Sequence, residues 1–154
     1  MSQDAFARLM HPVMEAIAGK PVNRALAAGL NQLFPGDGPH ILAIEAACHA
    51  AIAEGWMCSQ GGEGRRFGRV IPASPDTRDL SVDVVDLTEI VGPLHRHPDG
   101  EICLVMPVDA GAKFDGKGRG WCVYGPDSAH RPTVKGGRAL VLYLLPGGKI
   151  EFVE

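Results

Sequence analysis

The part of the chain after Trp56 consists of short apolar runs separated by turn residues, and this pattern restricts the fold more than any other feature of the sequence. The runs are rich in β-branched and aromatic residues, which favour strands, and proline, glycine and aspartate divide them. No helical periodicity lies between them, so the pattern predicts an antiparallel sandwich or barrel. Asp115-Gly116 and residues 135–137 (KGG) each predict a hairpin turn. The runs lie at residues 69–73, 80–91, 101–108, 112–115, 120–124 and 139–146.

The chain before Trp56 has helical periodicity instead. Residues 2–18, 21–34 and 39–54 each predict a helix, because apolar residues recur on one face of each. Ser2 is the N-cap of the first predicted helix, Pro21 lies in the first turn of the second, and Gly55 ends the third. Helices this short cannot bury their apolar stripes alone, so we expect residues 1–55 to pack on a β-barrel formed by residues 56–154. The predicted fold is a single α+β domain, mainly β.

Composition excludes several classes of partner. The chain of 154 residues has a formal net charge of -3 and no block of like charge, so we expect neither a nucleic acid nor an anionic membrane as a partner. Its longest apolar stretches are interrupted by polar residues and are too short to span a bilayer. The four cysteines form no CxxC pair, and the N-terminal residues have no signal pattern. We therefore expect a cytoplasmic protein with free thiols.

Residues 92–101 (GPLHRHPDGE) contain the strongest candidate for a functional site. His95 and His97 are two residues apart, so their side chains lie on one face of an extended segment. The turn residues that follow bring Glu101 back towards the same point, and His130 follows a second proline turn downstream. Two or three imidazoles with one carboxylate suit a divalent transition metal such as Zn, Fe, Mn, Co or Ni. The alternative is that these histidines are solvated turn residues and that Glu101 is only a surface charge.

The spacing of these residues resembles the two sequence motifs of the cupin superfamily. The first motif is His95-x-His97-x3-Glu101 with a later Gly111, and the second is Gly120-x5-Pro126 leading to His130. The second motif departs from the usual pattern, because Ser128 replaces its second glycine, His130 comes one residue early and the closing asparagine is absent. The resemblance implies a jelly-roll barrel, the double-stranded β-helix, with one divalent metal held by His95, His97, Glu101 and His130.

Other polar side chains are candidates for contact with a ligand. Cys103 shares a strand face with Glu101, where it is either a reactive thiol or a small buried hydrophobe. Tyr124 and Tyr143 either donate hydrogen bonds into the predicted pocket or only pack there. Three arginines precede the sheet, and they either form a solvated stripe or include one that binds a substrate carboxylate through both guanidinium nitrogens. These arginines are Arg65, Arg66 and Arg69.

A second resemblance covers most of the chain. A helical segment, then residues 55–70, then the motif of residues 92–109 and finally residues 125–134 (GPDSAHRPTV) are similar to a small bacterial family that includes 4-hydroxylaminobenzoate lyase. The resemblance implies addition of water to 4-hydroxylaminobenzoate, a small aromatic carboxylate, giving 3,4-dihydroxybenzoate and ammonia. This reaction balances without an external oxidant.

The metal would polarise the hydroxylamine oxygen or supply a hydroxide to the ring, and a quinone-imine would then lose ammonia by hydrolysis. Two other classes stay open, namely an Fe(II)-dependent cupin dioxygenase and a cupin that binds a small molecule without catalysis. A homodimer is the expected oligomeric state.

Overall fold

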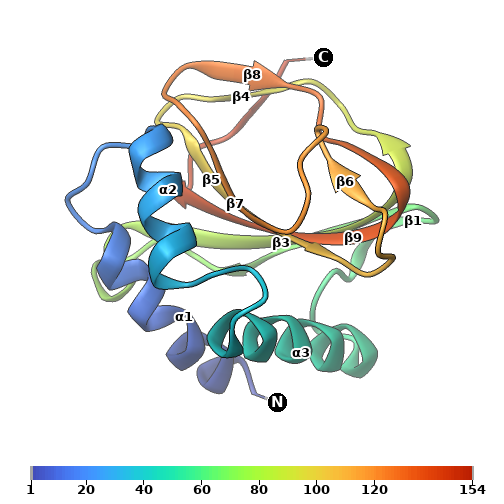
Figure 1. The fold of residues 1–154 in the computed structure, drawn as a ribbon, viewed down its shortest axis with the longest axis horizontal. Helices are drawn as coiled ribbons and strands as arrows, with labels where there is room; N and C mark the ends of the chain where they lie inside the picture. Colours follow the sequence, from blue (N-terminus) through green and yellow to red (C-terminus); the bar gives the residue numbers. More distant parts are fainter. Residues whose placement is uncertain (1, 154) are drawn as a thin grey trace.

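Two antiparallel sheets face each other, and three helices cover the outer face of the larger sheet (Figure 1). The computed structural model describes residues 2–153. Its helices are α1 (Gln3–Ile17), α2 (Arg24–Leu33) and α3 (Pro39–Glu54). All the strands follow α3 in the described chain, with one 3-10 turn at Pro75–Thr77. The strands are β1 (Gln60–Gly62), β2 (Arg65–Ile71), β3 (Leu80–Val91), β4 (His95–His97), β5 (Glu101–Pro107), β6 (Lys113–Phe114), β7 (Gly120–Tyr124), β8 (Ser128–His130), β9 (Thr133–Pro146) and β10 (Glu151–Phe152).

The helix boundaries follow their capping residues. The Ser2 hydroxyl accepts a hydrogen bond from Ala5 N and so begins α1 as predicted, while Gly55, with a left-handed φ of 88°, ends α3. The predicted start of the second helix, at Pro21, was wrong. Asn23 is the N-cap of α2, because its Oδ1 accepts from Leu26 N at 3.1 Å, and Pro21 therefore lies in the preceding loop.

The larger sheet has the strand order β1-β2-β3-β9-β5-β7, with β6 pairing to β9, and the smaller has the order β10-β4-β8. The first two strands, β1 and β2, form an antiparallel hairpin. The Asp115-Gly116 turn is confirmed, because φ is 50° and 80° at these residues and Phe114 pairs with Lys117.

The predicted hairpin turn at residues 135–137 is wrong, because these residues continue β9. Gly136 lies against the backbone of Gly111, and a Cβ added there would be 2.4 Å from the Gly111 carbonyl oxygen. The glycines in this strand thus permit a close approach between two backbones rather than a reversal of the chain.

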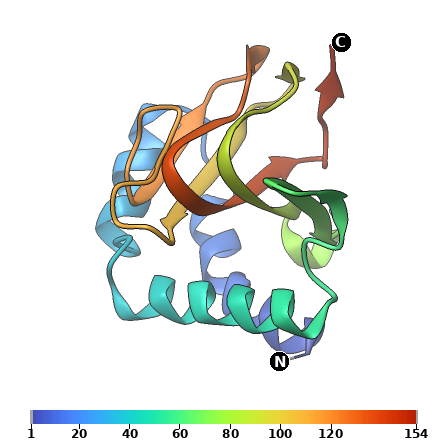
Figure 2. The ribbon, with the colours of Figure 1, turned by 90° about the vertical axis from the view of Figure 1, so that its right-hand side faces the viewer.

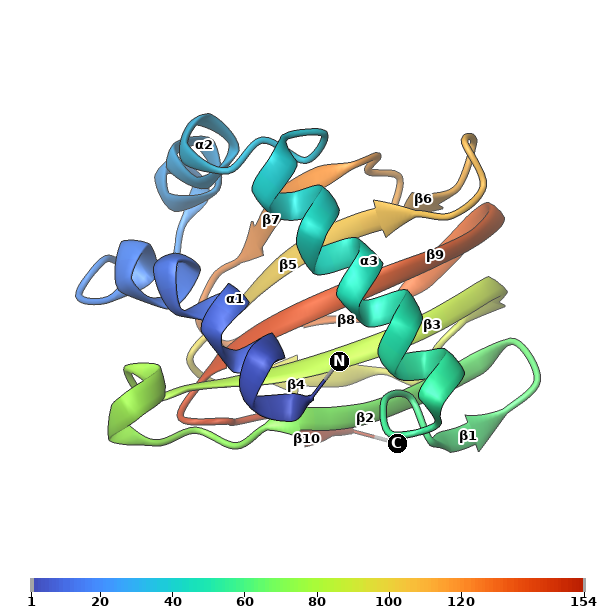
Figure 3. The same cartoon turned by 90° about the horizontal axis from the view of Figure 1, so that it is seen from below.

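Alternation along the central strands divides the interior into two cores. Along β5, Ile102, Leu104 and Met106 contact the helical layer, whereas Cys103 and Val105 face the smaller sheet. Figure 3 shows α1 and α3 crossing the underside of β3, β9 and β5, and Figure 2 shows the helices on the side of the larger sheet away from the smaller one. The helices and the larger sheet thus share one core. Within the described residues no helix is long and apolar enough to cross a membrane.

Candidate metal centre

Strands of both sheets bring the four predicted ligands to one point. His95 and His97 lie on β4, His130 ends β8, and the two strands pair so that His95 is opposite His130. Glu101 begins β5 in the larger sheet after the predicted turn, in which Gly100 N donates to the His97 carbonyl oxygen. Gly100 has a φ of 90°, and a Cβ there would lie 2.8 Å from the Tyr124 carbonyl oxygen, so only glycine fits the turn that returns Glu101 to the histidines.

The ligand atoms of these four residues all lie within 4.8 Å of one another. His97 Nε2 is 3.1 Å from His130 Nε2 and 2.9 Å from Glu101 Oε2, and His130 Nε2 is 3.4 Å from Glu101 Oε1. His95, His97 and Glu101 are buried and His130 is half-buried. With metal–nitrogen bonds of about 2.0–2.1 Å, opposite ligands of one ion lie about 4.2 Å apart, so small side-chain shifts suffice to bring all four onto one cation.

Burial and charge set the protonation of the cluster. Burial is the largest influence on His95 and lowers its pKa to about 4, which keeps the imidazole neutral and able to ligate. Burial alone would raise the pKa of Glu101, but its close contacts with His130 and His97 outweigh burial and lower this pKa to about 2. Burial alone would lower the pKa of His130, and its contacts with Asp115 and Glu101 instead raise it to about 9. The cluster thus holds an ionised Glu101 beside a neutral His95 and a protonated His130.

Several buried polar atoms of the cluster have no hydrogen-bond partner among the described residues. They include both ring nitrogens of His95, Nδ1 of His97 and Oε2 of Glu101, which contacts His97 Nε2 without hydrogen-bond geometry. Buried polar groups without partners are costly, and one donor atom from each of the four residues lies within 4.8 Å of the others. A divalent cation among these atoms would ligate Glu101 and one ring nitrogen of each histidine, so the donor set fits a transition metal.

An aspartate that the sequence did not identify as functional lies behind His130. Asp115 Oδ2 is 2.7 Å from His130 Nδ1 and accepts a hydrogen bond from the Tyr124 hydroxyl at 2.6 Å, while Oδ1 accepts from Thr133 N at 2.9 Å. The Tyr124 ring stacks on the His130 ring with centroids 4.3 Å apart. Burial alone would raise the pKa of Asp115, but the hydrogen bonds from His130 and Tyr124 lower it, so the group is an ionised acceptor.

Cys103 supports Glu101 from the same strand face. Its thiol donates to Glu101 Oε1 at 2.8 Å, and burial raises its pKa well above the ordinary value. A thiol that stays protonated and inaccessible is a weak nucleophile. Cys103 is therefore placed to hold a candidate ligand rather than to attack a substrate.

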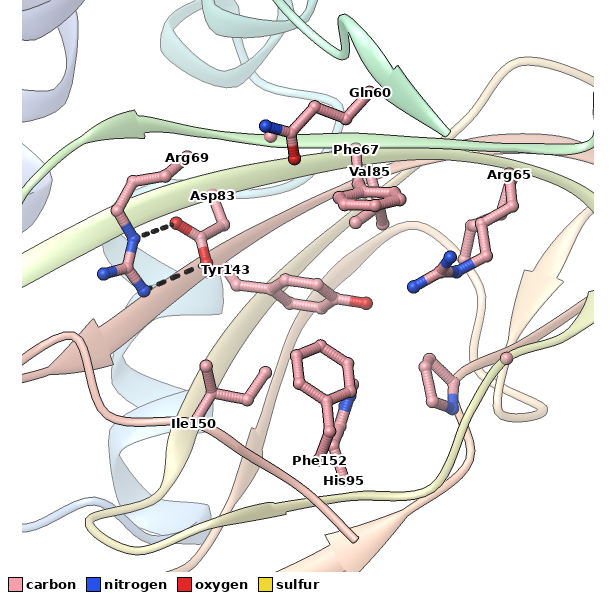
Figure 4. Close-up of a pocket in the computed structure, with 14 residues that line it drawn as sticks. Gln60, Arg65, Phe67, Arg69, Asp83, Val85, His95, Tyr143, Ile150 and Phe152 are labelled. Carbon is pink, nitrogen blue, oxygen red and sulfur yellow. Dashed lines mark hydrogen bonds and ion pairs between the residues drawn. The ribbon is translucent and has the colours of Figure 1, made fainter. Parts of the chain in front are cut away.

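A cavity of about 240 Å³ opens beside the cluster and reaches His95 (Figure 4). Its walls come from both sheets: Phe67 on β2 and Phe152 on β10 approach it from opposite sides. The Tyr143 side chain is 3% exposed, and its hydroxyl has no partner among the described residues. Further lining residues are Gln60, Arg65, Gly68, Arg69, Asp83, Val85, Leu87, Gly92, Pro132 and Ile150.

The three candidate arginines have different surroundings. Arg65 lines the cavity, its guanidinium lies 4.4 Å above the Phe67 ring, and no described carboxylate is within ion-pair distance of it. Arg69 also borders the cavity, but its guanidinium already pairs with Asp83 at 2.8 Å and donates to the Gly148 carbonyl oxygen at 3.0 Å. Arg66 is exposed and lies outside the cavity. Figure 4 shows the Arg65 guanidinium and the Tyr143 hydroxyl directed into the same space.

Of the other residues singled out from the sequence, Tyr143 borders the cavity, whereas Tyr124 and Cys103 lie behind the predicted ligands. Sequence reasoning missed Asp115, Phe67 and Phe152. Alternation along β2 could have identified Phe67, because it shares a strand face with Arg65 and Arg69. No sequence signal indicates that the short strand β10 brings Phe152 to the cavity.

Comparisons with known proteins agree with this architecture. The family model described as "PnbB: 4-hydroxylaminobenzoate lyase" matches residues 8–152. A 4-hydroxylaminobenzoate lyase of Nocardioides sp. (strain LMS-CY) is 27% identical over 151 residues, covering 92% of this chain and 89% of that protein. A 4-hydroxylaminobenzoate lyase of Pseudomonas putida is 28% identical over 153 residues, covering 88% and 87%.

Among solved structures, one described as DMSP lyases RdDddP and RnDddQII matches with a TM-score of 0.56 and 16% identity, over 99% of this chain and 96% of that chain. That likeness concerns the fold alone. Two facing antiparallel sheets, with the first-motif residues at the junction between them, agree with a jelly-roll arrangement. The predicted fold class, mainly antiparallel β with a helical N-terminal segment, is confirmed.

Proposed function

The chain belongs to the 4-hydroxylaminobenzoate lyase family, and we propose from this premise that it converts 4-hydroxylaminobenzoate and water to 3,4-dihydroxybenzoate and ammonia. The observation that carries the proposal is one cavity with a buried three-histidine and one-glutamate cluster beside it and an arginine without a carboxylate partner in its wall. The histidine–glutamate cluster suits the polar hydroxylamine group of the substrate, and the arginine suits its carboxylate.

His95, His97, Glu101 and His130 would hold one divalent transition metal. When bound, that metal would supply Lewis acidity towards the hydroxylamine oxygen and so ease cleavage of the N–O bond. The residues around the ligands keep them in place. Cys103 donates to Glu101, and Asp115 accepts from His130, so both ligands have fixed partners on the side away from the cavity.

The cavity wall would orient the substrate. Arg65 would bind the carboxylate through two guanidinium nitrogens, and Phe67 and Phe152 would contact the ring. This arrangement directs the hydroxylamine group towards His95. The Tyr143 hydroxyl is available to donate a hydrogen bond to the substrate, because burial raises its pKa well above the ordinary value and keeps it protonated.

The reaction balances with water alone. Water adds to the ring carbon beside the C–N bond as the N–O bond breaks, and the hydroxylamine oxygen leaves as water. A second water hydrolyses the resulting imine and releases ammonia, and loss of the proton on the hydroxylated carbon restores the aromatic ring. One water is consumed overall and no oxidant is needed.

The test is to purify the protein, measure its metal content by elemental mass spectrometry, and add 4-hydroxylaminobenzoate without oxygen. We expect about one metal per chain and equal amounts of ammonia and 3,4-dihydroxybenzoate. Product formation only with oxygen, and with oxygen consumption, would identify a dioxygenase instead. Substrate binding without any product would identify a non-catalytic binding protein. The homodimer and the cytoplasmic location stay predictions.

A further inference from the structure

The three candidate histidine ligands differ in the hydrogen-bond partner of the ring nitrogen that would not bind the metal. His130 Nδ1 is 2.7 Å from a carboxylate oxygen of Asp115. In contrast, His97 Nδ1 and both nitrogens of His95 have no hydrogen-bond partner among the described residues. Metal-binding histidines usually donate their second ring N–H to a carboxylate or carbonyl, which fixes the tautomer and the ring orientation. In this site only His130 has such a partner within the described part of the chain.

We propose that Asp115 is the positioning residue of the metal centre: it holds His130 in the tautomer that directs the Nε2 lone pair at the shared ligand point. The proposal rests on the metal centre proposed above and adds a residue outside its ligand set. It also gives Tyr124 a role, because this side chain stacks on His130 and donates its hydroxyl to Asp115 rather than lining the cavity.

The geometry around Asp115 explains why an aspartate is needed there. The backbone N–H of Thr133 can only donate, and it donates to Asp115 Oδ1 at 2.9 Å. Oδ2 then accepts from Tyr124 at 2.6 Å and lies 2.7 Å from His130 Nδ1. A carboxylate can accept from all three donors, whereas an asparagine has only one accepting oxygen.

The variant Asp115→Asn therefore has a defined consequence. Its oxygen would stay with Thr133 N, and its NH2 group would face His130 Nδ1. That nitrogen would have to accept, which places the ring proton on Nε2, the atom that faces His97 and Glu101. The backbone tolerates the change, because asparagine, like aspartate, adopts the left-handed φ of 50° observed here.

Asp127→Asn is a matched control. Asp127 also has a left-handed φ, 63°, and lies in the turn just before β8, so the substitution makes the same charge change close to His130. Its side chain is 71% exposed and pairs with Arg96 instead of a candidate ligand.

The experiment measures Zn²⁺ binding to the metal-free protein by competition with a chromophoric chelator, together with thermal unfolding of each metal-free variant. We expect Asp115→Asn to weaken Zn²⁺ binding by about 10- to 100-fold, the effect typical of removing such a partner, and Asp127→Asn to leave it unchanged. In a His130→Ala background, Asp115→Asn should weaken binding no further. A purely structural role would lower affinity equally with and without His130.

A measurement on the unmodified protein keeps the proposal testable if Asp115→Asn does not fold. In the Zn²⁺-loaded chain, proton–nitrogen NMR of the histidine rings should find His130 protonated at Nδ1. Asp115→Asn with native Zn²⁺ affinity would overturn the proposal and leave the metal centre intact, whereas protonation at Nε2 would overturn the proposal and remove His130 from the ligand set. Absence of Zn²⁺ binding by the unmodified chain would overturn both.

Discussion

Replacing Arg65 by alanine tests the assignment of the substrate carboxylate. Arg65 lines the cavity without an acidic partner among the described residues, so its guanidinium is available to a ligand. A hydrogen bond to a charged group contributes about 1.5–3 kcal/mol, which corresponds to a loss of roughly 10- to 150-fold in kcat/KM. Arg65→Lys should recover only part of this loss, because an ammonium group keeps the charge but not the two-point contact.

The assay compares two substrates and two arginines. Initial rates of ammonia release would be measured with 4-hydroxylaminobenzoate and with phenylhydroxylamine, which lacks the carboxylate. Arg65→Ala should lower kcat/KM for the first and leave that for the second unchanged. Arg66→Ala is the control, since Arg66 is the neighbouring residue on the same strand but is exposed and outside the cavity. Equal losses for both substrates, or equal effects of the two variants, would refute the assignment.

Three further predictions concern the ligands and the stability of the fold. His97→Ala removes a fully buried candidate ligand, so metal content and lyase turnover should both fall to background; full activity of a metal-free variant would contradict the metal-dependent mechanism. Leu142→Ala opens a cavity under the helical layer and should lower the free energy of unfolding by about 2–5 kcal/mol in urea titrations, against at most about 0.5 kcal/mol for Leu33→Ala at a position 60% exposed. Asn23→Ala removes the N-cap of α2 and should cost about 0.5–2 kcal/mol in the same titrations, which Asn23→Ser should largely restore.

Local sequence patterns predicted the elements whose causes are local. Ser2 and Gly55 specify helix ends through their own side chain or backbone, and the Asp115-Gly116 turn needs only two residues that accept a left-handed φ. The wrong predictions concern positions where another residue determines the local structure, either a nearby one or one in a distant segment. Pro21 is compatible with a helix start, but Asn23 offers a better cap, and Gly136 serves an approach to Gly111 that the local sequence does not encode.

The same distinction applies to the site. The four candidate ligands were proposed from spacing and family resemblance, because the short turn after His97 and the strand alternation constrain where their side chains point. Asp115 was predicted only as a turn residue. Its contact with His130, 15 positions away, depends on how the hairpin pairs with the start of β9, where Asp115 N donates to the Thr133 carbonyl oxygen. Selecting Arg65 from three arginines likewise required the partners of each side chain, since Arg69 binds Asp83.

The register of β5 connects the site to the helical layer. Glu101 faces the site because Ile102, Leu104 and Met106 face the helices, and a slip of one residue would exchange the two sets. These three side chains are fully buried, so the helical layer makes such a slip costly. The N-terminal helices supply none of the candidate ligands, which all come from strands in the described part of the chain, yet by covering the outer face of the larger sheet they fix which face of β5 presents its carboxylate to the histidines.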